Sequence, residues 1–165
     1  MTENATITLT HDTALTPSQV EQVARHSARL ELSESGADAI NRCRTQLEKV
    51  LDDGLPHYGI NTGFGSLSRK QIQADELEQL QLNLIRSHAA GVGEPLPDDV
   101  VRAMMLVLAA SLTRGYSGVR LEIVEQIITL LNAGITPVVP ESGSVGASGD
   151  LAPLSHFALS DQSKG

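Results

Sequence analysis

Residues 143–154 read GSVGASGDLAPL, and this stretch sets the expectations for the rest of the chain. Three glycines surround the small residues of its centre, and glycine lets a backbone turn tightly because it has no Cβ. With that freedom, the amide nitrogen of Gly149 can reach the carbonyl carbon of Ala147 and close a five-membered ring. Loss of water from the ring and from the Ser148 side chain would leave an electron-poor alkene. We therefore treat Ala147-Ser148-Gly149 as a candidate electrophile.

Two simpler interpretations of this stretch are a flexible loop and a glycine cradle for phosphate. The phosphate cradle is disfavoured because the stretch lacks the Lys-Ser or Lys-Thr pair of a P-loop. It also lacks the preceding strand that a dinucleotide-binding fingerprint requires. On the residues alone, a flexible loop and a ring-forming triplet both stay open.

Length and composition predict one soluble domain in a reducing compartment. The chain has 165 residues, 41% of them hydrophobic and only 2% aromatic, so its core must be aliphatic. A net charge of -8 argues against nucleic acid or an anionic membrane as partner. The single Cys43 excludes an internal disulfide. The N-terminus lacks the features of a signal peptide and the apolar run at 103–112 is too short to span a bilayer, so we expect a cytoplasmic protein.

Hydrophobic periodicity predicts a mainly α fold. Residues 5–9 alternate as a short strand would, and Thr16 with Gln19 forms a capping-box pattern before a helix that begins at Pro17. Apolar residues at helical spacing predict further helices over 34–52, 75–90, 97–115 and about 121–133. The helix expected over 97–115 is apolar nearly all round from residue 103 to 112, so we expect other helices to surround it.

A second glycine-rich stretch, residues 58–65, reads YGINTGFG. Three glycines in eight residues predict a loop with special backbone angles. Tyr58 and Phe64 either belong to a functional loop or anchor the loop to the core by packing. The residues alone favour the anchoring role.

A third candidate is His88, which shares a helical stripe with Leu77, Leu80 and Leu84. A histidine in such a position is more often a hydrogen-bonded core residue than a functional one. Its neighbourhood, residues 84–96, reads LIRSHAAGVGEPL.

These three stretches, in their order along the chain (58–65, 84–96 and 143–154), closely resemble the motifs of the aromatic amino acid lyases, and among them those of histidine ammonia-lyases. The resemblance implies that Ala147-Ser148-Gly149 forms 4-methylidene-imidazole-5-one (MIO) autocatalytically. It also implies that Tyr58 is a candidate catalytic base and that His88 contacts the imidazole of the substrate. Asp150 either assists ring closure or is simply an acid at a helix N-terminus.

The fold that the resemblance implies is the helical N-terminal portion of the fumarase/aspartase-like lyase fold, with long loops around the triplet. Residues 1–165 would form a single N-terminal domain fragment that carries the MIO loop (143–154). The later helices of the family, which supply further substrate-binding groups, have no counterpart in this sequence.

The function that the resemblance implies is the elimination of ammonia from L-histidine to give urocanate, in a homotetramer and with no metal. The MIO group makes the substrate nitrogen a better leaving group, or attacks the aromatic ring. Two alternatives stay open. One is a lyase or aminomutase that acts on tyrosine or another aromatic amino acid. The other is a non-catalytic helical remnant that associates with other chains.

Overall fold

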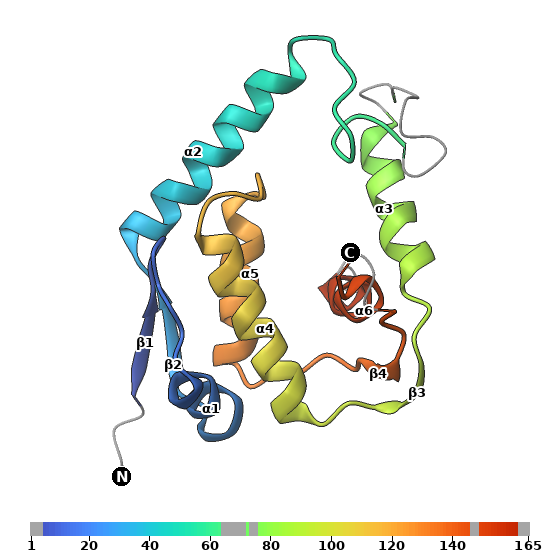
Figure 1. Cartoon of the computed structure of the whole chain (residues 1–165). Helices are drawn as coiled ribbons and strands as arrows, with labels where there is room; N and C mark the ends of the chain where they lie inside the picture. The colour runs from blue at the N-terminus through green and yellow to red at the C-terminus, as the bar shows by residue number, and fades with distance from the viewer. Residues whose placement is uncertain (1–4, 64–71, 73–75, 146–148, 162–165) are drawn as a thin grey trace. The chain divides into compact units, whose positions relative to one another are not determined.

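A computed structural model describes residues 5–63, 72, 76–145 and 149–161. The chain divides into two compact units. The first consists of Met1–Lys49 and Pro97–Thr136, and the second of Val50–Leu96 and Pro137–Gly165. Figure 1 labels the helices and strands of both units, and each unit is described by itself below.

The first unit begins with a small parallel sheet and two helices. Strand β1 (Thr6–Leu9) pairs in parallel with β2 (Arg29–Leu32), with Thr6 opposite Arg29 and Leu9 opposite Leu32. Helix α1 (Pro17–His26) connects the two strands, and α2 (Glu34–Leu51) follows the second. The predicted capping box at α1 is present: the Thr16 hydroxyl accepts from the Gln19 amide while the Gln19 side chain accepts from the Thr16 amide.

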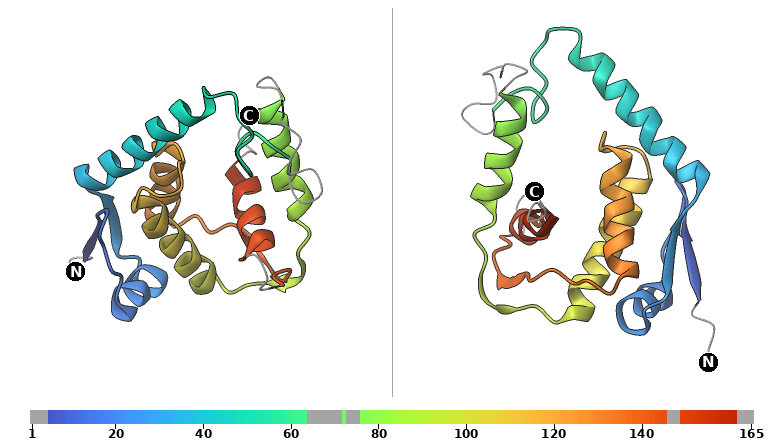
Figure 2. Two further views of the ribbon diagram at one scale, coloured as in Figure 1. Left: turned by 45° about the horizontal axis from the view of Figure 1, so that its top comes forward. Right: turned by 180° about the vertical axis from the view of Figure 1, so that it is seen from behind.

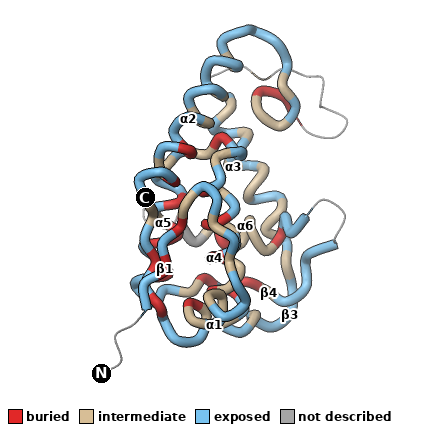
Figure 3. The backbone as a smooth tube through the Cα atoms, turned by 60° about the vertical axis from the view of Figure 1, so that its left-hand side comes forward, coloured by how far each residue is buried: buried red, intermediate tan, exposed pale blue. Residues whose placement is uncertain are grey.

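The core of the first unit lies around α4 (Asp98–Thr113) and α5 (Leu121–Asn132), which pack side by side (Figures 1 and 2). Helix α1 packs on α4, and β2 packs on α5. Figure 3 shows buried positions along these elements. The buried side chains are aliphatic, as the composition predicted, and include Leu9, Val23, Leu30, Val101, Met105, Leu106, Val124 and Ile127.

A buried arginine ties three helices of this unit together. Arg102 of α4 is only 7% exposed, and its guanidinium donates to the carbonyl of Val23 in α1 and to that of Leu131 in α5. Both carbonyls lie in the last turns of their helices, where the helix dipole favours a cation. The Leu131 carbonyl also accepts from the Gly134 amide. Arg102 therefore satisfies two helix C-termini without a buried carboxylate.

The amide of Asn132 closes the open edge of β2. Its Nδ2 donates to the carbonyl of Leu30 and its Oδ1 accepts from the amide of the same residue, both at 2.9 Å. The side chain therefore replaces a neighbouring strand and fixes the end of α5 against the sheet.

The second unit contains α3 (Leu77–His88), β3 (Val92–Pro95), β4 (Pro140–Ser142) and α6 (Leu151–Asp161). Strands β3 and β4 are antiparallel, with Val92 opposite Ser142 and Pro95 opposite Pro140. Helix α3 packs against α6, and the two lie next to each other in Figures 1 and 2.

The mainly α fold and the expected helices are confirmed, with ends that shift by a few residues. The helix expected over 97–115 extends over Asp98–Thr113, and the helix expected over 75–90 extends over Leu77–His88. The sequence reasoning missed β2, β3 and β4, and it anticipated α6 only through the interpretation of Asp150 as an acid at a helix N-terminus. The expected shielding of α4 is incomplete within the part of the chain that the structure describes, because Val100 and Val107 remain exposed.

Candidate functional site

The loop that follows α2 carries Tyr58 and is organised from its beginning by Asp53. The Asp53 carboxylate accepts from the Leu55 amide at 2.7 Å, and both of its oxygens lie 3.0 Å from Nε2 of His57. The Leu55 amide first, and the His57 ring second, hold the pKa of the Asp53 carboxyl below its ordinary value. These contacts of Asp53 therefore fix the backbone conformation at the beginning of the loop.

Asn61 holds the same loop from the inside. Its side chain is 4% exposed; Oδ1 accepts from the His57 amide at 2.6 Å and Nδ2 donates to the Leu55 carbonyl at 2.8 Å. The amides of Ile60 and Asn61 both donate to the His57 carbonyl, which closes a turn around Tyr58. Tyr58 itself is 66% exposed. The loop thus keeps its amide framework inside and presents the tyrosine outward.

His88 is the last residue of α3 and is half-buried. Its Nδ1 lies 2.8 Å from the carbonyl oxygen of Leu84. Because a carbonyl can only accept, Nδ1 carries a proton and donates it to Leu84. In the neutral ring, Nε2 is then left with a lone pair and acts as an acceptor. The backbone of α3 therefore fixes which nitrogen of His88 can receive a hydrogen bond.

The loop of the candidate electrophile follows β4. Gly146, Ala147 and Ser148 lie outside the described residues. Gly149 has a φ of +87°, which favours glycine, and among the described residues no heavy atom beyond its chain neighbours lies within 4 Å of where a Cβ would stand. The Ser144 hydroxyl donates to Oδ1 of Asp150 at 2.6 Å, so a hydrogen bond joins the two ends of the loop across the triplet.

Asp150 lies where α6 begins. Its carbonyl accepts the first helical hydrogen bond, from the Leu154 amide at 3.1 Å, and the helix starts at Leu151. Pro153 falls in the first turn, where its missing N–H costs nothing. This position agrees with the helix-terminal interpretation of Asp150. The candidate role in ring closure is untested by this geometry.

The second unit contains Tyr58, His88 and the triplet loop. A hydrogen bond connects the segment that follows His88 to α6, the helix that follows the triplet. The Gly91 amide, three residues beyond His88, donates to Nε2 of His156 in α6 at 2.9 Å. Helix α6 in turn begins directly after the triplet. The sequence reasoning missed three residues that build this arrangement: Asn61, Ser144 and His156. A signal existed only for Asn61, since asparagine in a glycine-rich stretch commonly forms side-chain turns.

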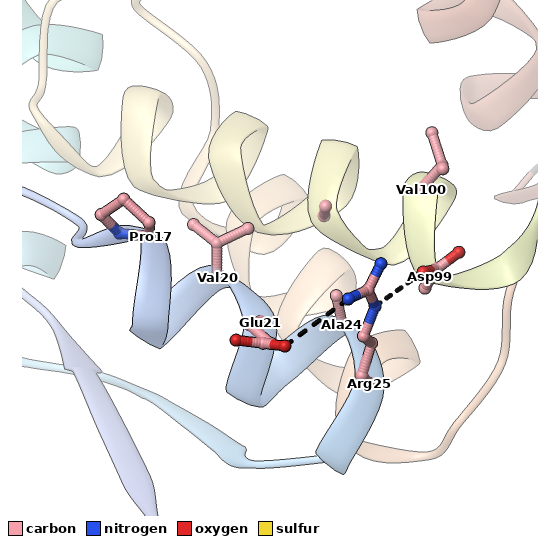
Figure 4. Close-up of a pocket in the computed structure, with 8 residues that line it drawn as sticks. Pro17, Val20, Glu21, Ala24, Arg25, Asp99 and Val100 are labelled. Carbon is pink, nitrogen blue, oxygen red and sulfur yellow. Dashed lines mark hydrogen bonds and ion pairs between the residues drawn. The ribbon is translucent and has the colours of Figure 1, made fainter.

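A groove in the first unit carries none of the predicted site residues. Its floor is apolar and comes from α1 and α4, while Arg25 lies at its rim between Glu21 and Asp99 (Figure 4). The Arg25 hydrogen bond lowers the pKa of Asp99. The geometry is that of a salt-bridged helix contact rather than of a catalytic site.

Among the described residues, no three His, Cys, Asp or Glu side chains gather as a metal ion would require. None of the described helices is long and apolar enough to cross a membrane.

Comparisons with known proteins match nearly the whole chain. A family model described as aromatic amino acid lyase covers residues 15–160. Histidine ammonia-lyase of Deinococcus radiodurans is 53% identical over 148 residues, which are 90% of this chain and 28% of that protein. The chain therefore spans about 28% of the length of these curated relatives, the histidine ammonia-lyases of Deinococcus radiodurans and Shewanella pealeana.

Two solved structures show the same architecture. The structure of histidine ammonia-lyase from Trypanosoma cruzi aligns with a TM-score of 0.82 at 41% identity, over 93% of this chain and 29% of that one. The structure of tyrosine aminomutase from Streptomyces globisporus aligns with a TM-score of 0.84 at 37% identity, over 92% and 28%.

Proposed function

Because the chain belongs to the aromatic amino acid lyase family, we propose that it carries part of the catalytic site of an ammonia-lyase that converts L-histidine to urocanate. The observation that supports this most directly is the arrangement of the second unit. There α3, which ends at His88, packs against α6, which begins immediately after the candidate triplet. Sequence identity of 53% to a histidine ammonia-lyase supports histidine as the substrate.

The residues of this chain fit the electrophile that the family implies. Ala147, Ser148 and Gly149 supply every atom of an MIO ring, so no external cofactor is needed. The positive φ of Gly149 suits a backbone that must bend back on itself. The bond between Ser144 and Asp150 shortens the loop and holds its ends together. When formed, the ring supplies an electron-poor alkene that activates the substrate for loss of ammonia.

We assign His88 to recognition of the substrate ring. Its Nδ1 proton is held by the Leu84 carbonyl, so Nε2 presents a lone pair to a ligand. An imidazole N–H is a matching donor, whereas the ring of phenylalanine has none. A histidine in this tautomer therefore discriminates in favour of a substrate ring that carries an N–H or O–H group.

We assign Tyr58 to removal of the β-proton. The Asn61 framework holds the turn while the tyrosine side chain is presented outward. Asp150 would hold the end of the triplet loop through Ser144 and, by its position beside the triplet, assist ring closure.

We further propose that both units belong to one N-terminal lyase domain, that the enzyme is a cytoplasmic homotetramer, and that it uses no metal. Family membership supports these proposals.

A second candidate function is an aminomutase or lyase that acts on tyrosine. The structural likeness supports this candidate as well as the first, since the TM-score is 0.84 to a tyrosine aminomutase and 0.82 to a histidine ammonia-lyase. A phenol hydroxyl can also donate to Nε2 of His88, so the local geometry accepts both rings.

A substrate comparison tests the proposal. The protein is incubated separately with L-histidine and L-tyrosine, and the ultraviolet absorbance of urocanate or of coumarate is followed. We expect urocanate from histidine and a much slower reaction with tyrosine. The Tyr58→Phe variant should lose turnover but keep the mass of a cyclised triplet. Coumarate or β-tyrosine as the main product would establish the second candidate instead.

A further inference from the structure

His156 lies on α6, one turn after Ala152, and its ring reaches back to the segment that leaves α3. The Gly91 amide donates to Nε2 of His156 at 2.9 Å, across 65 positions of sequence. In the preceding residue, the Ala90 amide donates to the carbonyl of His88 at 2.8 Å. The residue that precedes Gly91 is therefore hydrogen-bonded to the backbone of His88.

The contact determines the protonation of the His156 ring. A backbone N–H can only donate, so Nε2 must offer a lone pair. The neutral ring then carries its proton on Nδ1. In this form His156 accepts a hydrogen bond through Nε2. A side chain that replaces it must place an acceptor atom at the same distance from the backbone.

Close packing holds the contact from several sides. A Cβ on Gly91 would lie 2.9 Å from Nε2 of His156 and 3.2 Å from Cβ of Pro140. A Cβ on Gly143 would lie 3.0 Å from Cα of Gly91 and 3.0 Å from Cβ of Ala152. The segment after α3, the end of β4 and the first turns of α6 therefore meet with no room for a side chain. This meeting point lies beside the beginning of the triplet loop.

We propose that His156 is a positioning residue that fixes the segment after His88 against α6, the helix that follows the candidate triplet. It acts through the Gly91 amide and does not touch the substrate. The role of His156 in catalysis rests on the proposed function, in which His88 binds the substrate ring. The structural part, a neutral His156 that accepts from Gly91, stands on the geometry alone.

A pair of matched variants tests the contact. In His156→Gln, Oε1 lies as many bonds from the backbone as Nε2 and can accept from Gly91. In His156→Phe, the ring is kept but the acceptor is lost. We expect the Gly91 amide to exchange with solvent about tenfold faster in His156→Phe and at the parent rate in His156→Gln. The nuclear magnetic resonance signals of the His88 ring should shift only in His156→Phe.

The nitrogen shifts of His156 in the parent protein provide a test that needs no variant. We expect the signature of a proton on Nδ1. A proton on Nε2, unchanged Gly91 exchange in His156→Phe, or unmoved His88 signals in that variant would each overturn the inference.

Kinetics separate the positioning role from general damage. We expect His156→Phe to raise KM for L-histidine about tenfold with a smaller change in kcat, and His156→Gln to restore KM. In a His88→Leu background, the same Phe substitution should add less than about twofold, since the two residues act as one unit. An unchanged KM in His156→Phe, or full additivity, overturns the positioning role. A parent that shows neither cyclisation nor urocanate contradicts the proposed function, while the Gly91 and His88 signals still decide the role of His156.

Discussion

Replacing Asn61 with alanine should loosen the turn that presents Tyr58. The substitution removes two hydrogen bonds, from the His57 amide at 2.6 Å and to the Leu55 carbonyl at 2.8 Å. Each bond contributes about 1 kcal/mol, and a buried group left without a partner costs about 1–3 kcal/mol. Water reaches His57 and Leu55 in part, so we take the lower end. The opening free energy of the turn should fall by about 2 kcal/mol.

A loss of about 2 kcal/mol raises the open fraction of the turn about 30-fold, since every 1.4 kcal/mol is tenfold. Native-state hydrogen exchange at the Ile60 amide reports this opening, because that amide donates to the His57 carbonyl inside the turn. The Asn61→Asp variant keeps the acceptor but loses the donor, so its effect should be intermediate. Turnover should fall with the loss of an ordered Tyr58.

The matched control is Asn83→Ala. Asn83 is an exposed asparagine whose side chain accepts from Gln79 at 2.8 Å on the surface of α3. Its replacement should change exchange at Ile60 by less than about twofold. If Asn61→Ala left the Ile60 amide as slow as in the control, Asn61 would not hold the turn and the reasoning would be refuted.

Three further predictions concern the triplet, the core and the entry to the Tyr58 loop. Ser148→Ala should abolish both cyclisation and turnover, and full activity in this variant would show that the triplet is not the electrophile. Arg102→Met should lower the free energy of unfolding in urea by about 1–3 kcal/mol, because the Val23 carbonyl loses its side-chain donor and the Leu131 carbonyl is left with the Gly134 amide. The exposed Arg29→Met should cost less than about 0.5 kcal/mol, and equal midpoints for the two variants would contradict this role of Arg102. The pKa of Asp53 is lowered in the folded chain, so its contribution to stability is present above the unfolded pKa of 3.8 and is lost as pH falls through the lower folded value. A carboxyl titration by nuclear magnetic resonance should place the midpoint below 3.8, and a midpoint at or above that value would contradict the contacts.

Local sequence signals predicted most of the helices and the N-terminal cap of α1. The capping box at Thr16 and the apolar stripes of α4 and α5 depend on residues three or four apart, so they can be read from sequence. The motif loops were also identified. Their functional interpretation came from the resemblance, because glycine-rich stretches alone are compatible with ordinary turns.

Long-range contacts were not predictable in the same way. Strand β2 has only four residues and is defined by its pairing with β1, and β3 and β4 are joined across more than 40 positions. Helix α6 was anticipated only at its beginning, through Asp150, and its extent to Asp161 was not predicted. The contact of His156 with Gly91 depends on that helix and on packing that no local pattern encodes.

The central claim is that the backbone of Ala147-Ser148-Gly149 cyclises, and the mass of the peptide that spans residues 143–154 tests it most directly. Peptide mass spectrometry of catalytically active protein should find this segment lighter than its sequence by two water molecules. An unmodified mass for the segment in protein that releases urocanate from L-histidine would contradict the account.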